Sequence, residues 1–217
     1  MARKTWLQLV NAVLVKLRET SVASVSTNTY SELIGALVNE AKREVEDSYA
    51  WNALKDSIAV TTVANTLSYS LTNAGQRFSV TDVINDTSDV EMIPVPTGYM
   101  NRIITGSTES GDPAYYNFNG TDSNGDVIVD IYPLPDGIYS IYFNLIIPQA
   151  DLAADATGIY IPDEPVILNA YARALVERGE DGGLQSSEAY QLYRRSLANH
   201  IMLDIGRHPD ELIWVAK

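Results

Sequence analysis

The chain changes character at residues 57–71, which read SIAVTTV (57–63), then Ala64-Asn65, then TLSYSL (66–71). Both runs are rich in β-branched and aromatic side chains, which favour strands. Leu67, Tyr69 and Leu71 alternate with Thr and Ser, the two-residue period of a half-buried strand. We therefore expect a β-rich region to begin here.

Further strand candidates follow, separated by clusters of Gly, Asn, Asp and Pro. They are residues 79–85, 90–95, 99–105, 114–118, 126–132 and 138–147. Asn124-Gly125, between two of these runs, is a strong hairpin signal. Eight short strands with no long helix among them predict an antiparallel β-sandwich or small barrel over residues 57–162.

Helical periodicity precedes this region. Apolar residues at spacings of three and four predict a first helix over residues 4–19: Trp6, Leu9, Val10, Val13, Leu14 and Leu17. A second helix is expected over residues 29–55, with Thr29 as N-cap, Glu32 as its capping-box partner and Leu37 in the core. Its polar residues, Glu40, Lys42, Glu44 and Glu46 among them, are expected on the outer face.

Two more helices are expected after the β region. Pro162-Asp163-Glu164-Pro165 is typical of a helix start and predicts a helix over residues 163–178, with Leu175 in the core. Ser186 or Ser187 then opens a helix over residues 187–205. Its predicted inner face carries Ala189, Leu192, Tyr193, Leu197 and Ile201.

The predicted fold class is α+β. Neither helix pair has enough apolar area to stand alone, so we expect one four-helix bundle built from residues 1–56 and 163–206. The β domain, residues 57–162, is expected to be inserted between the two pairs. Residues 207–217 are expected to form a C-terminal assembly tail.

The composition restricts the chemistry. The chain has 217 residues, no cysteine and a net charge of −13. Disulfides, thiolate metal sites and a cysteine nucleophile are therefore impossible. Residues 57–162 carry two basic and twelve acidic side chains, a balance that repels nucleic-acid phosphate, although solubility alone explains it equally well. No clear secretory signal or long apolar run is present, so we expect a soluble cytosolic product.

Few residues suggest a catalytic or metal site. His200 and His208 do not match a metal-ligand pattern, and we expect structural or surface roles for both. Asp122 to Asp126 begins like a calcium loop but lacks the glycine and glutamate that such a loop needs, so a hairpin turn is the better interpretation. No nucleophile elbow or phosphate-binding loop occurs. We therefore predict that the chain is not an enzyme and has no catalytic, metal or cofactor site.

The last residues are the predicted contact site. Gly206 stops the last helix, and Pro209 discourages its continuation. Leu212, Ile213, Trp214 and Val215 then form an apolar run. Such a run favours a partner surface, with tryptophan a preferred interface anchor. The alternative, that this segment folds back onto its own bundle, stays open.

Several motifs carry a resemblance to a known family. They are Tyr49–Leu54, Gly111–Tyr116, the Pro-x-Pro-Asp-Gly turn within Ile131–Tyr139, Ile161–Ile167 and Ala170–Leu175. With the order of helices and strands, they resemble the bacteriophage head-to-tail adaptor (connector) proteins of the tail tubular protein A-like family. The chain departs from some relatives in its shorter segment after Gly206.

The resemblance implies a structural ring, typically of twelve subunits, between the portal protein and the tail nozzle or tail tube protein. Viral DNA would pass through the channel without specific binding. The subunit would belong to the virion neck, and to the host cytoplasm during assembly, with no membrane partner. The resemblance favours a portal contact for Leu212, Ile213, Trp214 and Val215.

Two other interpretations stay open. The chain could be a carbohydrate-binding or receptor-binding virion protein with a ligand site in the β domain, marked by paired carboxylates and exposed aromatic rings. It could also be a generic soluble bundle with a β insert.

Overall fold

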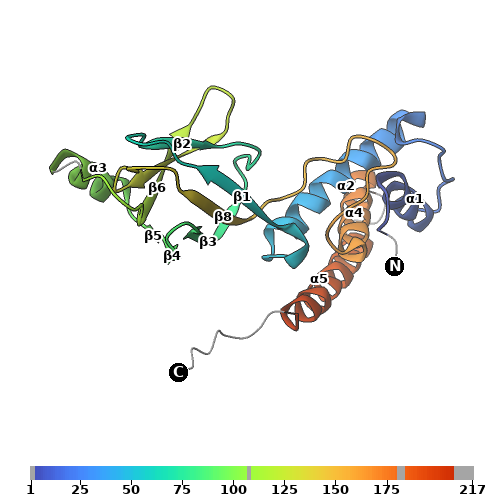
Figure 1. Cartoon of the computed structure of the whole chain (residues 1–217). Coiled ribbons are helices and arrows are strands. Elements are labelled where there is room, and N and C mark those ends of the chain that lie inside the picture. Colours follow the sequence, from blue (N-terminus) through green and yellow to red (C-terminus); the bar gives the residue numbers. More distant parts are fainter. Residues whose placement is uncertain (1–2, 107–108, 180–183, 208–217) are drawn as a thin grey trace. The chain divides into compact units, whose positions relative to one another are not determined.

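A computed structural model describes residues 3–106, 109–179 and 184–207. These residues form an α+β protein with five α-helices and two mostly antiparallel sheets (Figure 1). The chain divides into a helical unit, Met1–Leu54 with Pro148–Lys217, and a β unit, Lys55–Ile147. The β unit is thus inserted between the two halves of the helical unit along the sequence.

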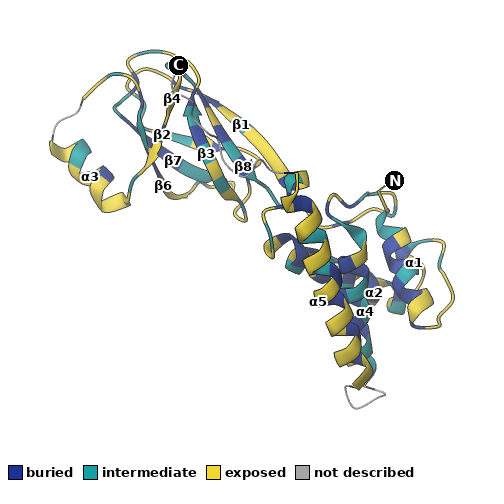
Figure 2. Cartoon of the chain, turned by 90° about the horizontal axis from the view of Figure 1, so that it is seen from below, coloured by how far each residue is buried: buried dark blue, intermediate teal, exposed yellow. Residues whose placement is uncertain are grey.

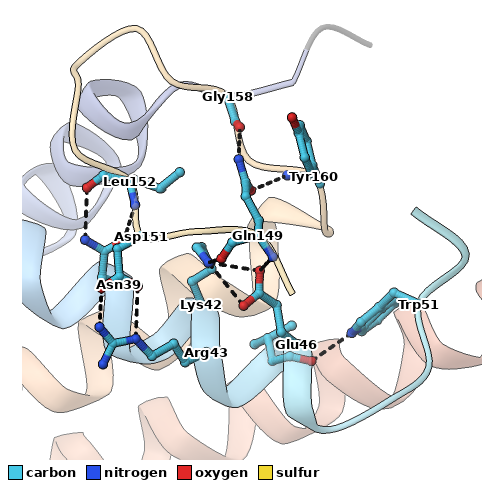
Figure 3. A network of polar contacts seen from close by, with 11 residues as sticks. Asn39, Lys42, Arg43, Glu46, Trp51, Gln149, Asp151, Leu152, Gly158 and Tyr160 are labelled. Carbon is cyan, nitrogen blue, oxygen red and sulfur yellow. Dashed lines mark hydrogen bonds and ion pairs between the residues drawn. The ribbon is translucent and has the colours of Figure 1, made fainter. Parts of the chain in front are cut away.

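The inserted unit is shorter than the sequence predicts. Residues 148–162, expected in the β domain, belong to the helical unit because this connection is bonded to α2 (Thr29–Asp47), as Figure 3 shows. The Asn39 side chain donates to the Leu152 carbonyl at 3.0 Å and accepts from the Leu152 N–H at 2.9 Å. Hydrogen bonds from a side-chain amide to the backbone do not require apolar residues at regular spacing. The hydrophobic pattern of the sequence therefore does not reveal this contact.

The same connection covers a buried ion pair. Lys42 Nζ lies 2.9 and 3.1 Å from the two carboxylate oxygens of Glu46 and 2.5 Å from the Gln149 carbonyl oxygen. Both charged side chains are 0% exposed. The Gln149 N–H donates to Glu46, and the Gln149 side chain bonds the backbone of Gly158 and Tyr160. The prediction that Lys42 and Glu46 lie on an outer face is therefore wrong.

The N-cap of α2 lies one residue earlier than predicted, although the helix itself begins at Thr29. Asn28 is the N-cap: it is extended, with φ −154° and ψ 164°, and its side chain accepts from the Ser31 N–H at 2.8 Å. The Ser31 hydroxyl accepts from the Asn28 N–H, which completes a capping box. Thr29 is already helical, so the predicted box of Thr29 and Glu32 does not form.

The end of α2 also differs from the prediction. The helix stops at Asp47 rather than continuing to residues 51–55. Beyond it the chain turns to place Trp51 in the core, 1% exposed, and a short 3-10 helix (Asn52–Leu54) follows. The indole Nε1 donates to the Val45 carbonyl at 2.7 Å. This hydrogen bond gives a partner to one of the last carbonyl groups of α2, and the donor is a buried indole ring.

The helical unit also contains α1 (Trp6–Lys16), α4 (Asp163–Arg178) and α5 (Leu184–Ile205). Helix α4 packs against α1, α2 and α5. A 3-10 helix, Val25–Thr27, precedes α2. The predicted α1 positions Leu9, Val10, Val13 and Leu14 are buried.

Two predicted core positions of the helical unit are displaced by one residue. Leu37 and Leu175 are only half-buried. Their neighbours Val38 and Ala174 are buried instead. In each pair of adjacent apolar positions, the residue with the smaller side chain is therefore the more deeply buried one.

The β unit contains two four-stranded sheets. Their strands are β1 (Lys55–Thr61), β2 (Ser68–Leu71), β3 (Ser79–Asn85), β4 (Val90–Glu91), β5 (Ile93–Pro94), β6 (Tyr115–Thr121), β7 (Val127–Tyr132) and β8 (Ser140–Ile146). The orders are β1-β8-β3-β4 and β2-β7-β6-β5. All pairs are antiparallel except β5 with β6. Both sheets contribute to one buried cluster, which includes Val60, Val83 and Phe143 from the first and Leu71 and Ile131 from the second.

The β unit also contains a helix that the sequence pattern does not predict. Residues 99–105, expected as a strand, lie in α3 (Thr97–Gly106). The N–H groups of Tyr99 and Met100 donate to the Pro96 carbonyl, which starts the first turn, and Met100 is the buried residue of α3. The β-branched residues of this run favour a strand intrinsically, and the turn at Pro96 overrides that preference.

Candidate interaction surface

The predicted contact residues Leu212, Ile213, Trp214 and Val215 lie outside the described residues. The last described residue, Arg207, lies two residues beyond the end of α5. The surface around the last turns of α5 is therefore the surface from which this segment leaves. The portal-contact prediction stays a prediction.

Helix α5 exposes several large apolar side chains. Its buried residues are Ser186, Ala189, Tyr193, Ser196 and Asp204. The first four are three or four residues apart, and most of the five are small or polar. Its exposed large apolar residues are Leu184, Tyr190, Leu192, Met202, Leu203 and Ile205. The broad exposed surface of α5 is visible in Figure 2.

The sequence pattern misplaces one of these residues. Leu192, predicted on the inner face of α5, is 56% exposed. The predicted inner residues Ala189 and Tyr193 are buried, whereas the apolar pattern omits the buried serines Ser186 and Ser196. The outer surface of α5 thus combines exposed apolar residues with polar ones such as Gln191, Arg194 and Arg195.

A polar network joins α5 to α4 and α2 at Glu44. Its carboxylate accepts hydrogen bonds from Asn169, Arg173 and Tyr193 at 2.8, 2.7 and 3.2 Å. Partial burial raises the pKa of Glu44, but these hydrogen bonds and the Arg173 charge together lower it below its ordinary value. Arg173 also pairs with Glu40 at 2.9 Å. The two glutamates thus both bind Arg173 of α4, and the Glu40 side chain stays 50% exposed, on the outer face as predicted.

A cleft of about 350 Å³ opens beside the last turn of α5 within the helical unit. Its apolar lining includes Trp51, Ala53, Ile159, Ile161, Pro162 and Leu203, and its polar lining includes Arg3, Lys4, Tyr160, Asp163, His200, Asp204 and Arg207. Three segments build it: the residues before α1, those after α2, and the connection that precedes α4.

Most of the charged side chains that line this cleft are paired. Asp204 is buried and accepts from the Asn52 N–H at 3.0 Å, while Arg207 lies 3.4 Å from its carboxylate. Lys4 pairs with Asp163 at 2.6 Å. The Arg3 guanidinium lies 4.8 Å from the centre of the Tyr160 ring. No described carboxylate pairs with Arg3, so the rim presents a positive charge beside an aromatic ring.

His200 fits the structural role predicted for it. Its Nδ1 lies 2.8 Å from the Ser196 carbonyl oxygen one turn earlier in α5, and its Nε2 lies 3.9 Å from Glu164. His208 lies outside the described residues. Among the residues that the structure describes, no group of three or more His, Asp or Glu side chains could hold a metal ion.

Two of the motifs that carry the resemblance meet in the β unit. Asp112, from the Gly111–Tyr116 motif, and Asp136, from the Pro-x-Pro-Asp-Gly turn, each lie 2.5 Å from the Tyr139 hydroxyl. Ser88 donates to Asp112 at 2.9 Å. The hydrogen bond from Tyr139, followed by that from Ser88, lowers the pKa of Asp112. These motifs therefore stabilise a loop junction in the β unit.

The turn from Asp122 to Asp126 is the predicted hairpin. It joins the antiparallel strands β6 and β7, with Gly125 at φ +88°. The Asp122 carboxylate accepts from the N–H groups of Asn124 and Asp126 at 2.8 and 3.0 Å. The turn's own backbone therefore satisfies the carboxylate that resembles the first residue of a calcium loop.

A shallow pocket of about 440 Å³ lies on the β unit. It is lined by Lys55, Asp56, Ser57, Thr81, Asp82, Asn144 and Leu145. Its lining contains two carboxylates but no aromatic ring. It therefore lacks the exposed aromatic side chains that the carbohydrate-binding interpretation expects.

The comparisons leave the family open. No family model and no curated protein matches the chain. None of the described helices is long and apolar enough to cross a membrane.

Proposed function

We propose that the chain is a structural head-to-tail adaptor subunit of a bacteriophage neck. It forms a ring, typically of twelve copies, between the portal protein and the tail nozzle or tail tube protein. In this proposal the helical unit is a four-helix bundle, and the β unit is a sandwich inserted into it. The subunit does no chemistry and belongs to the virion after assembly in the host cytoplasm.

The observation that carries the proposal is the exposed apolar surface of α5. Met202 and Leu203 are 69% and 66% exposed although the helix already has a buried face. Large apolar side chains on a second face cost solubility unless a partner covers them. A ring subunit has such partners: its neighbours, the portal above and the tail below.

The charge of the β unit supports the DNA-passage part of the proposal. Lys55–Ile147 carries three basic and eleven acidic side chains. A surface of this sign repels the phosphate backbone, so DNA can slide past it without being held. The residues predicted to reach the portal are Leu212, Ile213, Trp214 and Val215, as the motif resemblance suggests.

The test compares two similarly exposed apolar residues on different helices. Met202→Glu places a charge on the outer surface of α5, whereas Val15→Glu places one on α1, where Val15 is 61% exposed. We expect both variants to fold, because neither side chain is buried. Met202→Glu should lose co-elution with the portal ring in size-exclusion chromatography, and Val15→Glu should retain it. Equal binding by both variants would mean that α5 is not the assembly surface.

The carbohydrate-binding interpretation makes a different prediction. It places a ligand in the β unit, so Asp82→Asn in the shallow pocket should abolish glycan binding and leave self-association unchanged. Glycan-array binding that this variant loses, together with no portal association by the parent chain, would replace the adaptor proposal.

A further inference from the structure

We infer that the cleft beside the last turn of α5 is a binding site for the chain's own residues 208–217 in the free subunit. This cleft joins residues before α1, after α2 and before α4 to the end of α5. The inference concerns the isolated protein and does not depend on the proposed adaptor function.

The position of the cleft is the first reason. Arg207, the last described residue, is part of its lining, and so are Leu203 and Asp204 of α5. The segment 208–217 therefore leaves the helical unit at the rim of this cleft. An extended chain spans about 3.3 Å per residue, so Trp214 can reach any wall of it.

The chemistry of the lining is the second reason. The segment reads His208-Pro209-Asp210-Glu211-Leu212-Ile213-Trp214-Val215-Ala216-Lys217. It thus has an acidic pair followed by four apolar residues. The cleft offers the complement, with Ala53, Pro162 and Leu203 as accessible apolar residues of its lining and Arg3 on its rim. Its volume of about 350 Å³ is within the range of pockets that hold compact apolar groups.

Attachment favours the chain's own segment over that of a second copy. A short flexible connection holds a segment near its site at an effective concentration on the order of 1 mM. In a solution of about 10 µM protein, the attached segment therefore has about a hundredfold advantage over one from another molecule. The segment fills its own cleft as long as the molecule is free.

Two adjacent residues of α5 provide the test. Leu203 lines the cleft and Met202 does not, yet both belong to the same helical turn and are similarly exposed. The chain has no cysteine, so introduced thiols are the only ones present. Four double variants are made, each with one cysteine in α5 (Leu203→Cys or Met202→Cys) and one in the C-terminal segment (Val215→Cys or Ile213→Cys). Disulfide formation in dilute protein is followed on non-reducing gels.

If the segment docks in the cleft, the disulfide forms within one molecule, and it forms about tenfold faster with Leu203→Cys than with Met202→Cys. A tenfold ratio corresponds to a docking free energy of about 1.4 kcal/mol. Equal rates at the two positions would mean that the segment moves freely, which overturns the inference. Dimeric disulfides would also overturn it, because they place the segment in a second copy. Since no portal is present, none of these results decides the adaptor function.

Discussion

Gly35 is placed where α2 meets the indole of Trp6. A Cβ atom added at this position would lie 2.7 Å from Val25 Cγ1 and 2.9 Å from Trp6 Cζ2. The Trp6 Nε1 also donates to the Gly35 carbonyl at 3.4 Å. A glycine inside a helix therefore reflects close approach of two elements, here of α1 and the 3-10 helix before α2.

Gly35→Ala should destabilise the helical unit. Overpacking costs about 1–3 kcal/mol, and the higher helix propensity of alanine offsets about 1 kcal/mol of it, so we expect a loss of up to about 2 kcal/mol. Gly98→Ala in α3 is the control, because nothing lies within 4 Å of its Cβ position. Urea denaturation of both variants measures the difference, and equal midpoints would contradict the close contact.

The buried ion pair between Lys42 and Glu46 gives a second residue-scale prediction. Lys42→Met leaves the Glu46 carboxylate buried without its cation and should cost about 3–5 kcal/mol of unfolding free energy. Removing both charges, as in Lys42→Met with Glu46→Met, should recover most of this loss. Denaturant titration of the three proteins measures it. A double variant less stable than Lys42→Met would show that the pair is not a self-contained unit.

At the scale of the element, α2 has an inner and an outer face one residue apart. Ile34 is fully buried, whereas Leu33 is 36% exposed. Ile34→Ala should therefore cost about 2–5 kcal/mol, and Leu33→Ala less than about 1 kcal/mol because part of its surface is already in water. Thermal or urea unfolding of the two variants compares them. A larger loss from Leu33→Ala would invert the assignment of the faces.

The loop junction around Tyr139 makes the β unit sensitive to acid. The pKa of Asp112 is lowered by its hydrogen bonds in the folded state, so its stabilising contribution is present above its unfolded pKa, near 4. That contribution is lost as the pH falls through the lowered folded pKa. Tyr139→Phe should reduce the Tm at neutral pH and reduce the further drop in Tm on acidification. An unchanged acid-induced drop would mean that other carboxylates dominate.

Sequence patterns predict elements better when the packed face is apolar. The apolar repeat of residues 6–17 correctly marks the buried face of α1, and Asn124-Gly125 marks the hairpin of β6 and β7. On α5 the pattern correctly places Ala189 and Tyr193 on the buried face, but it also places Leu192 there, which is exposed. The buried positions that the pattern omits include Ser186 and Ser196. A small-residue repeat leaves little trace in a hydrophobic pattern.

At the scale of the whole molecule, hydrogen bonds decide the unit boundary. Residues 148–162 belong with the helices because Gln149 and Leu152 bond side chains of α2. No apolar periodicity records such bonds, so the sequence places the boundary later. The predicted contact residues Leu212, Ile213, Trp214 and Val215 lie outside the described residues, and their role depends on experiment.

The most direct test of the adaptor proposal is the mass of the complex formed with a purified portal ring of the same phage, measured by light scattering after size-exclusion chromatography. The account predicts a complex with one copy of this chain for each portal subunit, and the loss of that complex when residues 207–217 are deleted from a chain that still folds. A parent chain that elutes separately from the portal at every concentration, or a truncated chain that still saturates the ring, would contradict it.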